Sequence, residues 1–344
     1  MKRKILAAAA GFLAAVALLC GAVSAAPQLS ARSAVLLDGT TGRILCAKDA
    51  EHESLIASTT KIMTGLLAAE SCDPAQVVTV PPEAAGIEGS SLYLRAGEQV
   101  TVRELLYGLM LQSGNDAAVA LAVTCAGNQE AFVRQMNARA RELGLRHTHF
   151  DNPHGLDSET HYSTAEDLGR LAMAALENDL FREVVSTKSI TIGSRSFVNH
   201  NKLLRLYDGA MGVKTGYTKK AGRILVSAAE RGGRRLIAVT ISDPDDWNDH
   251  IKLLDCGFSQ YREQLILQAG QKMAEIPVLS GRRETVRAVA ARACSLPTSP
   301  EETITVRLRL PRFVYAPVRL GTFAGTAVIL ADGKELDRVP MIWQ

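Results

Sequence analysis

Residues 55–63 read Leu-Ile-Ala-Ser-Thr-Thr-Lys-Ile-Met and place Ser58 and Lys61 three positions apart, at the opening of an expected helix over 59–70. At that spacing the two side chains lie on one face of a helix, one above the other. A serine hydroxyl is a weak nucleophile until a base removes its proton, and a lysine can be that base when burial and cationic neighbours lower its pKa. Taken by itself, however, the pair is better explained by a surface helix start with an exposed lysine.

Two further motifs follow downstream. Ser113-Gly114-Asn115 lies between expected helices over 102–111 and 117–125, so a short loop can present Ser113 and Asn115 into a cleft. Lys214-Thr215-Gly216 ends an expected strand, and Lys and Thr together suit the binding of a carboxylate. Taken alone, the first motif is better explained as ordinary loop punctuation, and a Gly-terminated edge strand is the alternative for the second. The three in this order, on a helix start, an inter-helix loop and a strand, are typical of penicillin-binding proteins and class A β-lactamases.

Several longer stretches extend this likeness. Examples are Gly89-Ser90-Ser91-Leu92 and Lys214-Thr215-Gly216-Tyr217-Thr218. From about residue 30 to residue 342 the sequence resembles the D-alanyl-D-alanine carboxypeptidases, which are low-molecular-mass penicillin-binding proteins of serine peptidase family S11. The resemblance implies an α+β fold of the β-lactamase/transpeptidase type, in which helices flank an antiparallel sheet and form an inserted subdomain. A small all-β domain is expected to follow.

The resemblance also implies a mechanism on the peptidoglycan pentapeptide, the stem peptide that ends in D-Ala-D-Ala. Ser58 is expected to attack the penultimate carbonyl while Lys61 accepts its proton. Ser113 is expected to relay a proton to the departing D-alanine, and Asn115 to hold Lys61 and bond the substrate amide. Because β-lactam antibiotics mimic this substrate, they are expected to acylate Ser58 as covalent inhibitors, and water is expected to hydrolyse the acyl-enzyme of the natural substrate.

The third motif is expected to bind the substrate. By resemblance, Lys214 and Thr215 grip the terminal carboxylate, and Lys214 adds positive potential that keeps Lys61 neutral. The substrate backbone adds as a strand beside Thr215, Gly216 and Tyr217. The backbone N–H groups of Ser58 and Tyr217 are expected to form the oxyanion hole. Some relatives add an Arg before the last helix or in the Asn199-His200-Asn201 turn, where this chain has none. His200 is a candidate for that contact, although a solvent-exposed turn histidine is the simpler interpretation.

Two other functions remain as alternatives. A class A-like β-lactamase would carry a deacylating Glu in an E-x-x-L-N pattern, whereas residues 150–165 contain Glu159 without that pattern. Slow deacylation is therefore expected. A non-catalytic cell-wall-binding relative would keep the fold without turnover, but every expected catalytic side chain is present. Release of D-alanine from a model peptide distinguishes all three functions.

The composition excludes other classes of protein. The chain has 344 residues and a net charge of +3, and Lys2, Arg3 and Lys4 supply three of its positive charges. Without these residues the charges balance, which argues against a nucleic-acid partner. Neither the six cysteines nor the seven histidines show metal-ligand or disulfide spacing, so no metal, no cofactor and no disulfide framework are expected.

The N-terminal segment has the pattern of a secretory signal. Lys2-Arg3-Lys4 precedes an apolar run over 5–23 and small residues that end at Ala26. A signal peptide over 1–25 is predicted, with cleavage after Ala25. An uncleaved leader that tethers the protein to the membrane is the alternative, while lipidation at Cys20 is disfavoured by the bulky Leu19 before it. Each of these interpretations places the rest of the chain outside the cytoplasm.

The remaining pattern predicts two domains, a catalytic one over 26–261 and an all-β one over 262–344. A hairpin is expected around 38–42, and helices follow it, with capping boxes at Thr101/Glu104 and Ser163/Glu166. Strands are expected over 189–192, 210–213, 224–228 and 236–241, before a helix over 250–256. The N-terminal hairpin should therefore join a C-terminal sheet. Period-two alternation over 303–310 indicates the all-β domain.

Overall fold

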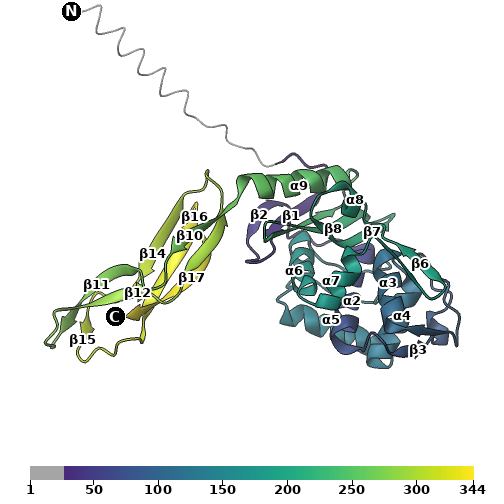
Figure 1. Cartoon of the computed structure of the whole chain (residues 1–344), viewed down its shortest axis with the longest axis horizontal. Coiled ribbons are helices and arrows are strands. Elements are labelled where there is room, and N and C mark those ends of the chain that lie inside the picture. The colour runs from purple at the N-terminus through teal and green to yellow at the C-terminus, as the bar shows by residue number, and fades with distance from the viewer. Residues whose placement is uncertain (1–26) are drawn as a thin grey trace, which may run out of the picture.

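The computed structural model describes residues 27–344, so the expected signal peptide over 1–25 lies outside the described residues. Figure 1 shows two bodies side by side, a mixed helix-and-sheet body and an elongated β body, joined where helix α9 (Asp246–Gln260) leads into strand β10 (Arg262–Leu267). The expectation of an α+β region followed by an all-β region is confirmed. Within residues 27–344, none of the helices has the length and apolar character that crossing a bilayer requires.

A five-stranded antiparallel sheet forms the centre of the first body. Its order, β2-β1-β9-β8-β7, inserts the C-terminal strand β9 beside the N-terminal strand β1. The register runs from Ser33 opposite Ile241 to Asp38 opposite Leu236. The predicted joining of the N-terminal hairpin to the later strands is thus confirmed. The strands are β1 (Ser33–Asp38), β2 (Ile44–Lys48), β7 (Ala210–Thr218), β8 (Gly222–Arg231) and β9 (Arg234–Ile241).

Both faces of the sheet are covered, which explains the continuous buried runs in its inner strands β1, β8 and β9, whereas the edge strand β2 is mostly exposed. All six residues of β1 are buried. On one face, Leu253 and Leu254 of α9 belong to the same apolar cluster as Leu36. On the other face, helix α6 (Ala165–Leu176) contacts β1 and β9. Strands buried on two sides read as continuous apolar runs and lose the period-two alternation of a half-exposed sheet.

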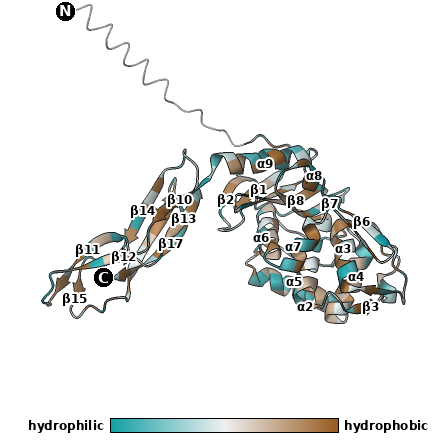
Figure 2. Cartoon of the chain, in the orientation of Figure 1, coloured by the Kyte–Doolittle hydropathy of each residue, from teal (hydrophilic) through white to brown (hydrophobic). Residues whose placement is uncertain are grey.

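The helical region packs around helix α4 (Asn115–Ala126), whose first eight residues are all buried. Helix α5 (Gln129–Glu142) covers it from outside and buries Phe132, Met136 and Ala140 on one face. Figure 2 shows teal, hydrophilic residues on α5. The other elements here are η1 (Ala57–Thr60), α2 (Lys61–Ser71), β3 (Val77–Thr79), η2 (Pro82–Ala84), β4 (Gln99–Thr101), α3 (Val102–Leu111), α7 (Asp179–Ser186), β5 (Ser189–Ile192), β6 (Arg195–Val198) and α8 (Leu203–Leu206).

One of the two predicted helix starts is confirmed and the other is displaced. The N–H of Glu104 donates to Thr101 Oγ1 over 3.1 Å, so Thr101 is the N-cap, while the Glu104 carboxylate accepts from Arg195. At the second site the cap is Thr164, which accepts from the N–H of Asp167 over 3.1 Å. Ser163 cannot take that place because its backbone exchanges two hydrogen bonds with Ser54 in an isolated β-bridge.

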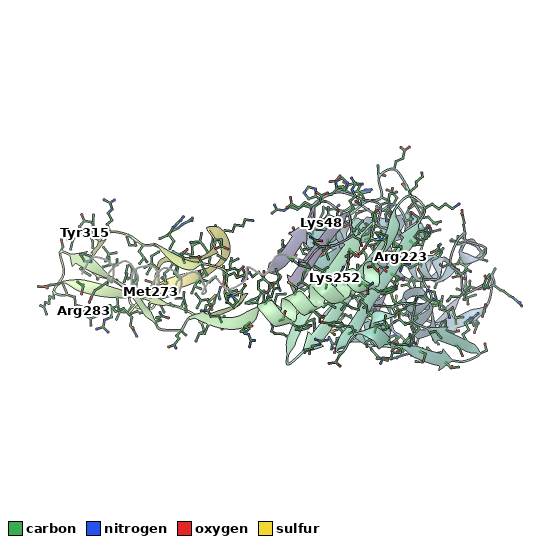
Figure 3. The ribbon with its side chains drawn as sticks, turned by 90° about the horizontal axis from the view of Figure 1, so that it is seen from above. Lys48, Arg223, Lys252, Met273, Arg283 and Tyr315 are labelled. Carbon is green, nitrogen blue, oxygen red and sulfur yellow. The ribbon has the colours of Figure 1, made fainter. Side chains whose placement is uncertain are left out.

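The second body has its own apolar core, distinct from those around the first sheet. A six-stranded sheet in the order β14-β16-β17-β12-β11-β15 encloses it together with the pair β10–β13. Figure 3 shows Arg283 and Tyr315 at the far end of this body, away from Arg223 and Lys252. The remaining strands are β11 (Lys272–Leu279), β12 (Thr285–Ala290), β13 (Cys294–Thr298), β14 (Ile304–Arg309), β15 (Val314–Tyr315), β16 (Phe323–Ala331) and β17 (Lys334–Trp343).

Candidate active site

Ser58 lies in the short 3-10 turn η1 that precedes α2, next to strand β7. The strand comes so close because residue 216 is a glycine: a Cβ there would lie 3.2 Å from Ile56 O and 3.3 Å from Ser58 N. A cleft of about 580 Å³ opens between these elements. Its lining residues are Ser58, Ser90, Ser113, His200, Thr215, Gly216, Tyr217, Arg223, Ile224 and Asp246.

Lys61 lies beneath Ser58 and is completely buried. Its Nζ donates three hydrogen bonds, to Ser58 Oγ over 3.1 Å, to Asn115 Oδ1 over 2.7 Å and to His154 O over 2.6 Å. These acceptors come from the turn before α2, the start of α4 and a loop that precedes α6. The ammonium is therefore fixed from three directions, within reach of the serine oxygen.

Burial and charge both act on the two lysines of the site. Desolvation lowers the pKa of Lys61 well below its ordinary value, repulsion from Lys214 lowers it further, and Asp116 opposes the shift. Burial lowers the pKa of Lys214 to about 7. Both effects disfavour the protonated form. The neutral form of Lys61, which both effects favour, is the one that can accept a proton from Ser58.

The loop before α4 holds Ser113 and Asn115 in place. Ser113 has a φ of +63°, a left-handed conformation that is uncommon outside glycine. Its Oγ is buried and finds no hydrogen-bond partner in the described part of the chain. Besides its bond with Lys61, Asn115 is held by two hydrogen bonds to backbone carbonyls. Its backbone N–H donates to Ser90 O over 2.7 Å, and its Nδ2 donates to Glu88 O over 2.5 Å. The loop thus places an unpartnered hydroxyl at the cleft wall.

The third motif is partly at the cleft and partly behind it. Thr215, Gly216 and Tyr217 line the cleft, and the Tyr217 side chain is exposed. Lys214 is buried, and its Nζ donates to Thr215 O over 2.8 Å. Lys214 thus lies behind the cleft wall, while Thr215, Gly216 and Tyr217 present the strand edge to the cleft. The expected cluster around Ser58 is assembled, with Lys214 behind the surface of the cleft.

His154 was missed by sequence reasoning, although its carbonyl oxygen is one of the three acceptors around Lys61. Gly155, with a φ of +89°, lets this loop press against the η1 turn, where a Cβ would overlap Ala57 O. His161 Nε2 lies 2.8 Å from Thr60 Oγ1 and anchors the same loop to the end of η1. Every residue carries a backbone carbonyl, so the sequence does not indicate which carbonyl accepts a hydrogen bond from Lys61.

Arg223 was also missed. It follows the turn after β7, pairs in the sheet with Tyr217 and lines the same cleft as Ser58. Asp246 accepts hydrogen bonds of 2.7 to 3.1 Å from its guanidinium, and Trp247 lies beneath it, 5.8 Å from ring centre to Cζ. Figure 3 shows Arg223 on the body that carries α9. His200 also lines the cleft, and burial and Lys214 lower its pKa.

The described residues contain no cluster of His, Cys, Asp or Glu with the arrangement of a metal site. Around Ser58 a serine hydroxyl lies beside a buried amine whose pKa is lowered, an arrangement that suits nucleophilic catalysis. The family model described as D-alanyl-D-alanine carboxypeptidase, of peptidase family S11, matches residues 21–245. The chain belongs to this family. It is therefore a serine-type peptidase of the hydrolase class, and a model of the C-terminal domain of penicillin-binding protein 5 matches residues 261–344.

Individual relatives agree with this assignment. The D-alanyl-D-alanine carboxypeptidase DacF of Bacillus subtilis is 35% identical over 327 residues, which cover 90% of this chain and 84% of that protein. The crystal structure of penicillin-binding protein 5 from Haemophilus influenzae matches with a TM-score of 0.79 at 29% identity, covering 92% of this chain and 97% of that one. The Streptomyces K15 DD-transpeptidase matches with a TM-score of 0.65 at 36% identity, covering 68% of this chain and 99% of that one. The fold is thus that of the penicillin-binding proteins.

Proposed function

We propose that this member of the S11 family is a serine D-alanyl-D-alanine carboxypeptidase, which removes the terminal D-Ala from peptidoglycan stem peptides through an acyl-enzyme on Ser58. The observation that carries the proposal is the 3.1 Å hydrogen bond between Lys61 Nζ and Ser58 Oγ, made by a buried amine of lowered pKa. A neutral lysine at this distance removes the serine proton as the oxygen attacks.

Acylation needs a second proton transfer, because the leaving D-alanine must be protonated. Ser113 is suited to this step, since it lines the cleft and its buried hydroxyl has no hydrogen-bond partner among the described residues. The proton taken from Ser58 passes through Lys61 and Ser113 to the departing amine. Asn115 keeps Lys61 aligned during the transfer and offers its amide to the substrate backbone.

Substrate binding follows from the edge of strand β7. The stem peptide lies antiparallel beside residues 215–217 and accepts main-chain hydrogen bonds there. The N–H groups of Ser58 and Tyr217 stabilise the oxyanion, because Gly216 allows the strand to approach the η1 turn. Thr215 and the charge of Lys214 bind the terminal carboxylate. Arg223 adds a cation at the same cleft, held in place by Asp246.

β-Lactam antibiotics enter the same cleft and acylate Ser58, and the adduct persists. Rapid deacylation in a class A β-lactamase needs a carboxylate that activates water. Among the residues that line this cleft, Asp246 is the carboxylate, and it is bonded to Arg223. Glu159 is exposed on its loop and does not line the cleft. The lactamase alternative therefore lacks its catalytic base.

The enzyme works outside the cytoplasm, in the cell wall or at the membrane surface. The basic and apolar N-terminal segment supports export, either with cleavage after Ala25 or with the leader retained as a tether. We further propose that the catalytic domain ends at residue 261 and the β domain begins at residue 262. The end of α9 at Gln260, the start of β10 at Arg262 and the separate apolar cores support this boundary.

The test is release of D-alanine from diacetyl-Lys-D-Ala-D-Ala by the purified chain. The wild type should release D-alanine and Ser58→Ala should not. Ser259→Ala, which changes an exposed serine of α9, is the matched control and should keep full activity. A folded wild type that releases no D-alanine would contradict the proposal and favour a wall-binding protein without turnover.

A further inference from the structure

Cys72 and Cys125 lie against each other although 53 positions separate them in the sequence. Their Sγ atoms are 2.6 Å apart, closer than two unbonded sulfur atoms normally approach. In the structure both are thiols and both are half-buried. Among the other cysteines of the described chain, Cys46 and Cys256 are close enough for an electrostatic interaction, and Cys294 Sγ donates to Asp337 Oδ2 over 3.2 Å.

The contact lies at a defined place in the fold. Cys72 is the C-cap of α2, and Cys125 is the last residue but one of α4. The two helices have 11 and 12 residues and begin together, because their first residues, Lys61 and Asn115, share a hydrogen bond. Helices of nearly equal length that start side by side and run parallel also end side by side. The two cysteines therefore meet about three turns away from the active site.

We propose that Cys72 and Cys125 form a disulfide bond in the exported protein, which joins the distal ends of the two helices that carry the catalytic lysine and asparagine. The two helices are then held together at both ends, by the hydrogen bond between Lys61 and Asn115 at the cleft and by the disulfide at the opposite end. Extracytoplasmic compartments are oxidising enough for such bonds to persist.

The chemistry is a thiol–disulfide exchange. The hydrogen bond with Cys125 lowers the pKa of the Cys72 thiol to about 6, so Cys72 is the thiolate that attacks. It attacks a disulfide-bonded oxidant, either a protein oxidoreductase or oxidised glutathione, and forms a mixed disulfide. Cys125 then displaces the second thiol of the oxidant. Two S–H bonds are lost and one S–S bond forms, while the oxidant takes up two electrons and two protons and leaves as two thiols.

The crosslink should stabilise the catalytic body without changing its chemistry. It closes a long loop, and such closure removes conformations from the unfolded chain while leaving the native contacts as they are. The oxidised protein is expected to melt roughly 5–15 °C above the reduced one. The rate at which a labelled penicillin acylates Ser58 at 25 °C should be the same in both forms, because the helices are already packed. Melting reports on the disulfide independently of the proposed activity.

The experiment starts with the fully reduced chain, which is incubated with oxidised glutathione at neutral pH. Iodoacetamide then blocks the remaining thiols, and peptides are mapped without reduction. A single Cys72–Cys125 crosslink is expected, with the other three cysteines alkylated. Alkylation of both Cys72 and Cys125 in the oxidised sample would overturn the proposal, as would a crosslink between either of them and another cysteine.

Variants supply the matched controls. Cys46→Ser should keep the crosslink and the difference in melting temperature between oxidised and reduced protein. Cys72→Ser and Cys125→Ser should each abolish both. Comparison of the oxidised and the reduced wild type needs no variant, so a substitution that impairs folding does not prevent the test. Equal melting temperatures of a crosslinked and a reduced wild type would overturn the stabilising role.

Discussion

Lys61 and Asn115 are the first residues of two parallel helices, and the lysine ammonium donates a 2.7 Å hydrogen bond to the asparagine side chain. The contact fixes the base beside Ser58. In Asn115→Ala the amine loses this acceptor and can move away from the serine, so kcat/KM for D-alanine release should fall roughly 100-fold. Asn248→Ala, on the exposed start of α9, is the matched control. Unchanged kinetics in a folded Asn115→Ala protein would contradict the positioning role.

The pH dependence of the reaction should have two limbs. Acylation requires neutral Lys61, so its rate should rise with pH through the lowered pKa of this lysine. Lys214, with a pKa of about 7, loses its charge over the same range, and KM should rise above about pH 7 as carboxylate binding weakens. Lys214→Arg keeps the charge and should move the alkaline limb upward. A KM that is constant across neutral pH in the wild type would contradict the role of Lys214.

Arg223 and Asp246 should affect substrate binding in opposite directions. Arg223→Gln removes a cation from the cleft, so KM should rise roughly 10-fold with a smaller change in kcat. Asp246→Asn removes the opposing charge but keeps an acceptor for the guanidinium, so KM should stay equal or fall. Arg262→Gln, on β10, is the control. A KM that rises equally in both cleft variants would indicate that the pair only supports the fold.

A β-lactam should leave a persistent adduct. After incubation with benzylpenicillin, intact-mass spectrometry should show the protein heavier by one penicillin molecule, and Ser58→Ala should show no adduct. Because Glu159 is exposed and outside the cleft, Glu159→Gln should not slow the decay of the adduct. Rapid loss of the adduct from the wild type, slowed by Glu159→Gln, would instead favour the β-lactamase function.

Acid should destabilise the catalytic body through buried histidines. Burial lowers the pKa of His154 and of His161 to about 4 and that of His250 to about 3. Between these values and the ordinary pKa of about 6.5, the unfolded chain binds protons that the native one does not, so the free energy of unfolding falls as pH falls.

Each of the three histidines contributes about 1.4 kcal/mol per pH unit in that range. Urea unfolding at several pH values measures the slope. His250→Asn should reduce the slope by about one third, whereas exposed His147→Asn should not reduce it. A stability that is independent of pH from about 6 down to 5 would contradict the prediction.

Much of the site could be predicted because its side chains belong to short motifs. Ser58 and Lys61 share one helical face, and Asn115 begins the next helix, so residue types and spacing carry the information. The carbonyl of His154 could not be predicted, since every residue has one and the fold decides which of them faces Lys61. The second capping box was misplaced by one residue because Ser163 is occupied by its β-bridge with Ser54.

Arg223 was missed for a different reason. The sequence predicts a strand from Ile224, whereas β8 begins at Gly222. Arg223 therefore lies before the predicted strand, and the prediction assigns its side chain to neither face of the sheet. The hairpin register that sets Arg223 opposite Tyr217 depends on the turn between β7 and β8. In the same way, the odd number of cysteines after the leader concealed the Cys72–Cys125 pair, which only the parallel packing of two helices brings together.

The pairing of β1 with β9 has a consequence for biogenesis. A chain that is threaded N-terminus first delivers β1 about two hundred residues before the strand that completes its pairing. Until then the early hairpin exposes one unsatisfied backbone edge, which is prone to intermolecular association. Because β7 follows Ser58 by about 150 residues, the serine and the KTG strand can come together only after most of the first body has been made.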